Sequence, residues 1–113
     1  MNTIYKGTDL VFDIYLSDKK GYPFRVKDTT EFIVEFFTND CCRPIQCTYS
    51  EGSYEGIVEG KRIDKIVINA SDLAKLESGV LNYAYKYRFP ADIFDDSYYD
   101  ETGIGSTNYY IQN

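Results

Sequence analysis

Three cysteines and one acidic segment are the parts of the chain whose residue types and spacing could support chemistry. Cys41, Cys42 and Cys47 lie within seven residues, close enough to suggest a zinc site. Structural zinc takes a full set of Cys or His ligands, usually as two spaced pairs, but the chain has no His and two of its cysteines are adjacent. We therefore expect no metal site here and reduced thiols, the normal state in a cytosol. A disulfide between Cys47 and one of the other two is the alternative.

The acidic segment extends from Asp92 to Glu101 and contains five carboxylates. Such a segment could surround calcium, which accepts many oxygen ligands. Its spacing does not match the calcium loop of helix-loop-helix proteins, which needs ligands at alternate positions, a central Gly and a final Glu. A solvated loop is the ordinary explanation, and a calcium site is the alternative. Glycoside cleavage would need one acid in an apolar pocket, and an exposed loop does not provide it.

Nothing in the sequence positively indicates an enzyme. Without His, a Ser or Cys nucleophile would need another base, and the Gly-x-Ser-x-Gly pattern of many hydrolases does not occur. Gly103-Ile104-Gly105 lacks the third Gly, the preceding strand and the following helix of a phosphate-binding loop. We interpret it as a flexible entry to the last strand. We expect no catalytic residues and no cofactor.

The charge of the chain limits its partners. Eighteen acidic and twelve basic side chains give a net charge of −6. This disfavours nucleic acid, because binding to phosphates depends on Lys and Arg, and it disfavours an anionic membrane surface for the same reason. The chain starts without a basic segment followed by an apolar run, and eighteen apolar residues never occur together. We therefore expect no secretory signal, no membrane span and synthesis in a cytosol.

One short helix followed by one long strand is the clearest structural signal. Within Asn69–Gly79, Ser71 or Asp72 is a natural helix cap, and Gly79 can end the helix because glycine readily adopts a left-handed backbone. Beyond Gly79, apolar and aromatic residues recur at every second position, the period of a strand with one buried face. That face consists of Leu81, Tyr83, Tyr85, Tyr87 and Phe89.

The rest of the chain reads as further short strands separated by turns. The expected strands are Thr3–Lys6, Leu10–Leu16, Glu31–Thr38, Ile45–Tyr49, Tyr54–Glu59, Lys65–Ile68 and Ser106–Ile111. No segment is long enough for a crossover helix, so this pattern favours an all-β fold with antiparallel strands, and a sandwich over a barrel. We expect an antiparallel Ig-like β-sandwich of seven to eight strands with one short helix. It should form a single domain over residues 1–113.

Tyrosine is unusually abundant, with 12 Tyr and 7 Phe but no Trp. Tyrosine is common in strands and also at protein interfaces. Adjacent strand residues point to opposite faces, so one ring of the pair Tyr109-Tyr110 should lie near the surface. If the loop containing Tyr98 and Tyr99 folds beside it, these rings could anchor a protein contact bordered by carboxylates. The candidate interface residues are Tyr98, Tyr99, Tyr109, Tyr110, Asp95 and Asp96.

Three segments together resemble parts of known virion proteins. They are Lys6–Asp9 before an alternating strand, Ser17–Pro23 before an irregular crossing, and Ile66–Pro90 with the helix and the tyrosine strand. They are similar to small virion proteins of crAss-like Bacteroides phages and to the amino-terminal sandwich of phage baseplate upper proteins. The resemblance covers nearly the whole chain. Where such relatives continue through an Asp-Gly turn after the tyrosine strand, this chain has Asp95-Asp96-Ser97.

The resemblance implies a non-enzymatic building block that is made in the host cytoplasm and located in the virion. It would be an auxiliary (decoration) or head-fibre protein attached to the capsid shell. Its partners would be other virion proteins, above all the major capsid protein, and further copies of itself, because repeated copies strengthen modest contacts. A tail or baseplate adaptor is one alternative. A stand-alone protein- or carbohydrate-binding module would instead show a ligand groove, and an enzyme would show perturbed carboxylates in a cleft.

Overall fold

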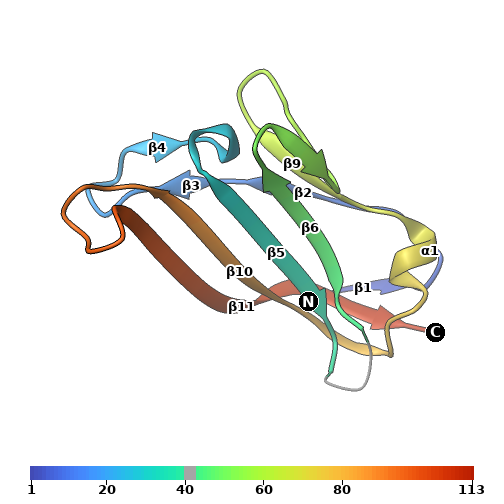
Figure 1. The fold of residues 1–113 in the computed structure, drawn as a ribbon. Helices are drawn as coiled ribbons and strands as arrows, with labels where there is room; N and C mark the ends of the chain where they lie inside the picture. The colour runs from blue at the N-terminus through green and yellow to red at the C-terminus, as the bar shows by residue number, and fades with distance from the viewer. Residues whose placement is uncertain (40–42) are drawn as a thin grey trace.

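The computed structural model describes residues 1–39 and 43–113 (Figure 1). Strands make up 57% of the chain and helices 6%, so the expectation of a mostly β fold with one short helix is confirmed. The helical parts are α1 (Ala70–Leu73) and a 3-10 turn, η1 (Val26–Asp28). No helix of the described residues is long enough to cross a membrane. The strands of the described residues are β1 (Asn2–Tyr5), β2 (Leu10–Ile14), β3 (Leu16–Ser17), β4 (Pro23–Phe24), β5 (Glu31–Phe37), β6 (Ile45–Ser50), β7 (Ser53–Glu55), β8 (Ile57–Val58), β9 (Asp64–Ile68), β10 (Gly79–Pro90) and β11 (Tyr98–Gln112).

These strands outnumber the seven to eight expected, chiefly because two expected strands are divided. The strand expected from Leu10 to Leu16 is interrupted at Tyr15, which separates β2 from β3. The strand expected from Tyr54 to Glu59 is interrupted at Gly56, whose φ of 71° is positive. As a result β7 belongs to one sheet and β8 to another. Gly56 is the point at which the chain passes from sheet to sheet, and glycine tolerates the backbone that this needs.

The largest sheet has six strands in the order β1-β11-β10-β5-β6-β7. Its pairs are antiparallel except β1 with β11, which run parallel with Asn2 beside Tyr109 and Tyr5 beside Gln112. The expectation of a wholly antiparallel fold is therefore wrong at this edge. A parallel pair needs a long connection between its strands, and here nearly the whole chain lies between β1 and β11.

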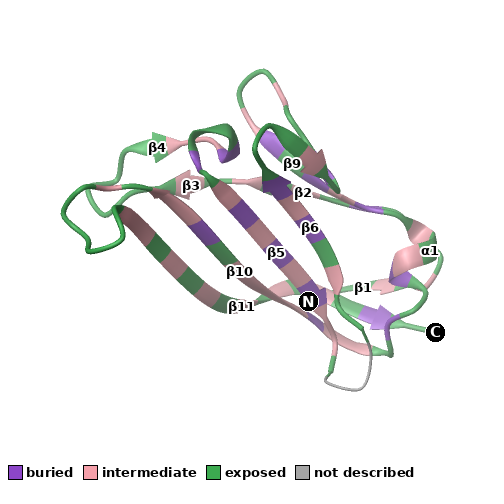
Figure 2. Ribbon diagram, in the orientation of Figure 1, coloured by how far each residue is buried: buried purple, intermediate pink, exposed green. Residues whose placement is uncertain are grey.

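A second sheet has three strands in the order β2-β9-β8, and β3 pairs with β4 separately. The two larger sheets share one apolar core, and Figure 2 shows the buried residues of both in purple. Into this core β5 places Phe32, Val34 and Phe36, and β9 places Ile66, all of them buried. Phe12 of β2 stacks on Phe36 with ring centroids 5.4 Å apart. The inner faces of the two sheets therefore meet at β5.

An ion pair fixes the segment between β4 and β5 to the start of β9. Arg25 donates to Asp64 from Nε at 3.1 Å and from Nη2 at 2.5 Å. The amide of Val26 donates to the same carboxylate at 3.1 Å. Burial alone would raise the pKa of Asp64, but these hydrogen bonds outweigh it and hold the pKa below its usual range. The contact holds the fully buried side chain of Val26 in the core.

The short helix is not capped by Ser71 or Asp72, as the sequence predicted. Asn69 is the N-cap residue, without a cap hydrogen bond from its side chain, while Ser71 and Asp72 lie inside α1. The cap comes from far along the chain, because Oδ1 of Asp9 accepts a hydrogen bond from the amide of Ala70 at 2.6 Å. Gly79 does not end this helix; it is the first residue of β10, with a positive φ of 152°.

The last strand is much longer than expected. β11 begins at Tyr98 instead of Ser106 and pairs with β10 over most of its length. The predicted acidic loop therefore ends before Tyr98, and Gly103 and Gly105 lie in mid-strand, which corrects their interpretation as a flexible entry. Glycine is poor in strands because it has no side chain to pack. In β11, tyrosine rings from β10 occupy the space that side chains at Gly103 and Gly105 would take.

Candidate functional site

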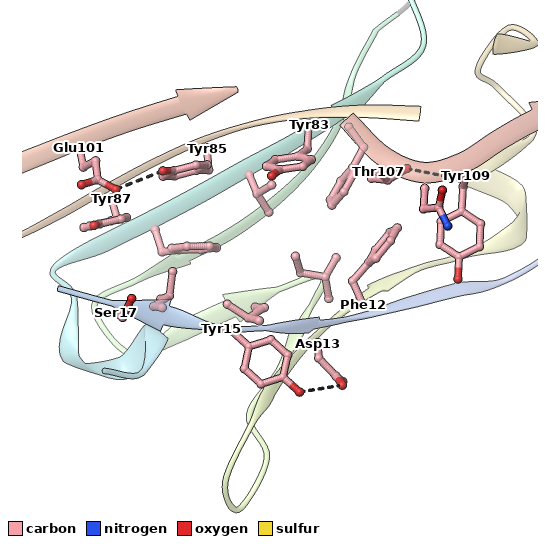
Figure 3. Close-up of a pocket in the computed structure, with 17 residues that line it drawn as sticks. Phe12, Asp13, Tyr15, Ser17, Tyr83, Tyr85, Tyr87, Glu101, Thr107 and Tyr109 are labelled. Carbon is pink, nitrogen blue, oxygen red and sulfur yellow. Dashed lines mark hydrogen bonds between the residues drawn. The ribbon is translucent and has the colours of Figure 1, made fainter. Parts of the chain in front are cut away.

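A groove with a volume of about 670 Å³ lies between the β2–β3 strands and the ribbon formed by β10 and β11 (Figure 3). Phe12, Ile14 and Leu16 line it from the second sheet and its continuation into β3. The buried side chains of β5 also line it, as do tyrosines of β10. The groove exists because the second sheet has three strands and the first has six, so part of the larger sheet is left without a covering strand.

The strand period of β10 places its tyrosines in this groove. Tyr83, Tyr85 and Tyr87 share the inner face of β10, as the sequence predicted, and all three line the cavity. Their rings are stacked, with centroids 6.5 Å apart between Tyr83 and Tyr85 and 6.1 Å apart between Tyr85 and Tyr87. Phe89 continues the row 5.9 Å from Tyr87. The inner face of β10 is thus a ladder of parallel aromatic rings.

Two glycines of β11 give these rings their space. Gly103 is the cross-strand partner of Tyr85, and Gly105 is the partner of Tyr83. A β carbon at Gly103 would lie 2.4 Å from Cε1 of Tyr85, and one at Gly105 would lie 2.7 Å from the hydroxyl of Tyr83. Real side chains do not approach so closely, so each ring lies over the backbone of a glycine. This covering of a strand glycine by an aromatic neighbour stabilises sheets that contain glycine.

Glu101 supplies the charge of the groove. Its carboxylate accepts hydrogen bonds from the hydroxyls of Tyr99 at 2.8 Å and Tyr85 at 3.1 Å, and Figure 3 shows it at the end of the tyrosine row. The hydrogen bond from Tyr99 is the main reason that the pKa of Glu101 lies below its usual range. Burial and the bond to Glu101 raise the pKa of Tyr85. The groove therefore contains an ionised carboxylate beside neutral phenols.

This arrangement suits binding better than catalysis. A general acid in an apolar cleft needs a raised pKa, whereas the pKa of Glu101 is lowered. The other acid at the groove, Asp13, is paired with Lys65 at 2.6 Å. Ser17 and Lys20 have the Ser-x-x-Lys spacing of some serine nucleophiles and their lysine base. Both are exposed, but Ser17 ends β3 and Lys20 lies in the turn that follows, so no helix aligns the two side chains.

The four candidate interface tyrosines do not form one patch. Tyr98 and Tyr99 lie at the start of β11, and Tyr109 and Tyr110 lie near its end. Eleven residues of extended chain span about 36 Å, so the expected joint patch is excluded by the length of the strand. The expectation that Tyr109 and Tyr110 take opposite faces is confirmed. Tyr109 packs edge-on against Phe12 at 5.6 Å, and Tyr110 is exposed.

At the other end of β11, the expected patch is a network of contacts within the chain. Arg88 binds Asp100 with Nε at 2.7 Å and Nη2 at 3.0 Å, and its Nη2 lies 3.4 Å from Asp96. The same guanidinium lies over the ring of Tyr98, 4.7 Å from its centroid. Asp95 is exposed. Two of the candidate residues, Asp96 and Tyr98, thus contact Arg88 and each other, while the opposite face of β11 carries Tyr99 and Glu101.

Neither metal alternative gains support from the structure. Within residues 1–39 and 43–113, no group of three or more Cys, Asp or Glu side chains is placed to hold an ion. Cys41 and Cys42 lie outside the described residues. Cys47 is buried in β6 as a free thiol, and burial raises its pKa to about 11, which disfavours the thiolate that binds metals.

The groove itself was missed from the sequence, although one signal for part of it was present. Tyr99, Glu101, Gly103 and Gly105 occupy alternate positions, the period of one strand face. If the expected strand Ser106–Ile111 is extended toward the amino terminus with the same alternation, Glu101 is placed as a carboxylate on the inner face.

No family model, curated protein or solved structure was found to match this chain.

Proposed function

We propose that this chain is a non-enzymatic structural protein of a phage virion, an Ig-like β-sandwich attached to the capsid shell as an auxiliary (decoration) or head-fibre protein. The proposal starts from the resemblance of three segments, Lys6–Asp9, Ser17–Pro23 and Ile66–Pro90, to small virion proteins. The observation that carries it is the groove. It is a cavity of about 670 Å³ lined mainly by apolar and aromatic side chains, with one ionised carboxylate that accepts hydrogen bonds from tyrosine hydroxyls.

A cavity of this kind supports a role in assembly. Cavities that combine apolar walls with a few polar groups are the usual form of binding sites, and aromatic side chains are enriched in protein interfaces. The net charge of −6 favours a partner with a basic surface, such as another virion protein. In a particle with many copies, modest contacts per copy add up to firm attachment. A tail or baseplate adaptor would use the same surface.

The same groove supports a second candidate, a stand-alone carbohydrate-binding module. Its volume of about 670 Å³ is within the range of small-ligand sites, which combine apolar walls with a few polar groups. The stacked rings of Tyr83 and Tyr85 offer flat apolar surface, and the carboxylate of Glu101 could accept hydrogen bonds from sugar hydroxyls.

Electron microscopy of purified particles that carry this chain tests the proposal. Density for the chain on the capsid shell supports the decoration or head-fibre role, and density at the tail supports the adaptor role. Absence from every particle refutes both. Calorimetry of the isolated chain with a panel of oligosaccharides tests the second candidate. Binding that Tyr85→Ala abolishes, with circular dichroism unchanged, would support the module, and no heat with any sugar would exclude it for that panel.

A further inference from the structure

Two strand edges beside the groove have no partner in the described residues. β11 pairs with β10 on one side, but β1 covers its other side only from Tyr109 to Gln112. The edge of residues 98–108 is therefore unpaired within the described part of the chain. β2 is likewise the last strand of its sheet, paired with β9 alone. The groove lies between these two edges (Figure 3).

Unpaired edges of this length are unusual in a folded protein. An edge strand exposes backbone donors and acceptors that pair readily with another chain, and proteins normally protect such edges with proline, charged side chains, bulges or short strands. The open part of β11 has no proline, and its pairing with β10 is regular from Tyr98 to Ser106. Its two charged side chains are held by contacts within the chain, Asp100 by Arg88 and Glu101 by tyrosine hydroxyls. The irregularity in that pairing lies between Ser106 and Tyr110 of β11, so it affects only the end of the open edge, Thr107 and Asn108. The regular part of this edge, residues 98–106, is thus suited to pair with a further strand.

An added strand at this edge would also fill the groove. It would continue the six-stranded sheet in the place that β1 takes beside the last residues of β11. Alternate side chains of a strand point to one face of its sheet, so every second side chain of the added strand would point toward Phe12 and Ile14 across the groove. Apolar side chains at these positions would close the open side of the groove next to β11, while β10 lies between them and the floor formed by β5.

The charge of the groove indicates what kind of segment fits. Glu101 lies on the inner face of β11, where its carboxylate is bound by two tyrosine hydroxyls and has its pKa lowered chiefly by Tyr99. A Lys or Arg in the added strand would pair with this charge. A second copy of this chain, with net charge −6, would meet electrostatic repulsion instead. The geometry therefore favours a different protein with a basic residue among its apolar ones.

We propose that the groove binds an extended segment of another virion protein, which adds a strand to the open edge of β11 at residues 98–108. The segment alternates apolar side chains facing the groove with polar ones facing outward, and a Lys or Arg on the apolar face pairs with Glu101. This mode of recognition, in which a peptide extends a sheet, obtains its affinity from main-chain hydrogen bonds and its specificity from alternate side-chain pockets. The inference rests on the proposed function, because it names the contact by which the chain would join a particle.

A panel of synthetic peptides tests the binding mode directly. The peptides are eleven-residue chains of alternating Val and Thr in which one Val is replaced by Lys at successive positions; matched peptides carry Glu instead of Lys, and a control has Pro at alternate positions. Affinity is measured by fluorescence anisotropy, and amide hydrogen exchange locates the bound strand. We expect at least one Lys peptide to bind and to protect the amides of 98–108, and the proline control to do neither. No protection of 98–108 by any peptide would overturn the inference.

Two variants test the role of Glu101. In Glu101→Gln the amide oxygen can still accept the tyrosine hydrogen bonds, but the charge is lost. We expect the Lys peptide to bind about three- to tenfold more weakly and the difference between the Lys and Glu peptides to disappear. Asp100→Asn, on the neighbouring residue that faces away from the groove toward Arg88, should leave that difference unchanged. Equal binding of Lys and Glu peptides to the original chain would overturn the assignment of a basic partner.

Hydrogen exchange of the chain on and off purified particles separates this inference from the proposed function. If the chain attaches to particles and the amides of residues 98–108 exchange more slowly there, both the virion role and strand addition are supported. If it attaches but these amides exchange as fast as in the free chain, the virion role is retained and strand addition is overturned. If the isolated chain forms dimers in which 98–108 is protected without any peptide, the occupant is a second copy and the assignment of a different partner is overturned.

Discussion

The ring of Tyr85 lies over the backbone of Gly103, so close that a β carbon on this glycine would be 2.4 Å from Cε1 of the ring. The two residues are cross-strand partners in β10 and β11. Neither the ring nor the glycine would be favoured here without the other, because an uncovered glycine weakens a strand and the ring would have no space beside a larger residue. The contact defines one wall of the groove.

Gly103→Ala should destabilise the protein. In an ordinary strand position alanine is at least as favourable as glycine, but here its β carbon would displace the ring of Tyr85. We expect the free energy of unfolding to fall by about 1–3 kcal/mol, the usual cost of overpacking, measured by urea denaturation. In a Tyr85→Ala background the same substitution should cost much less. An equal cost in both backgrounds would show that the ring is not responsible.

The course of β10 could be predicted from the sequence because its signal is local. Leu81, Tyr83 and Tyr85 alternate with more polar residues, and this period of two fixes both the strand and its buried face. The same holds for β5, where Phe32 and Val34 are buried as one face. Such strands form because their own side chains favour them.

The first half of β11 and the groove could not be predicted in this way because they depend on distant parts of the chain. Gly103 and Gly105 are poor strand formers, and they lie in a strand because β10 pairs with them and covers them. The parallel partner of β11 comes from the opposite end of the sequence. The groove arises because one sheet has six strands and the other has three, and this difference cannot be inferred from the sequence of any single segment. Tyr98 and Tyr109 were expected to meet only because the strand between them was not foreseen.

Asp64→Ala should be among the most destabilising substitutions in the chain. Asp64 is 2% exposed, and its removal leaves the guanidinium of Arg25 and the amide of Val26 without their shared acceptor. Breaking a buried pair in this way costs about 3 kcal/mol, to be measured by urea denaturation. Asp13→Ala is the control, because it removes an exposed pair with Lys65 and should change the urea midpoint little. Similar effects of the two substitutions would contradict the burial argument.

The stability of the protein should decrease in acid. The pKa values of Asp64 and Glu101 are lowered in the folded state, so at low pH the unfolded chain binds protons that the folded chain does not. The free energy of unfolding is then highest above the ordinary carboxyl pKa of about 4 and falls as the pH decreases through it. Urea midpoints at a series of pH values from neutral to acid measure this. The double variant Asp64→Asn, Glu101→Gln should show a flatter profile, and Asp95→Asn, in the exposed loop, should not.

Ser97→Gly should stabilise the turn between β10 and β11. Ser97 has a positive φ of 65°. The left-handed backbone costs a residue with a side chain about 1 kcal/mol, and glycine avoids this cost. Glycine also loses more conformational freedom on folding, which offsets part of the gain in stability. We expect a net gain of about 0.5 kcal/mol by thermal or urea denaturation. Ser53→Gly, in β7 with an ordinary backbone, should destabilise, so a gain there too would point to another cause.

Cys47 should react slowly in the folded protein and rapidly once the protein unfolds. It is 1% exposed, and burial raises its pKa to about 11 from the ordinary value of 9.0, which lowers the thiolate fraction about a hundredfold at neutral pH. In a Cys41→Ser, Cys42→Ser background, in which Cys47 is the remaining thiol, labelling with an aromatic disulfide reagent measures this rate. Labelling should be at least a hundredfold slower without urea than in unfolding concentrations of urea. A comparable rate in both conditions would mean that β6 opens readily, and the groove floor, which β5 forms beside it, would then be too mobile to hold an added strand.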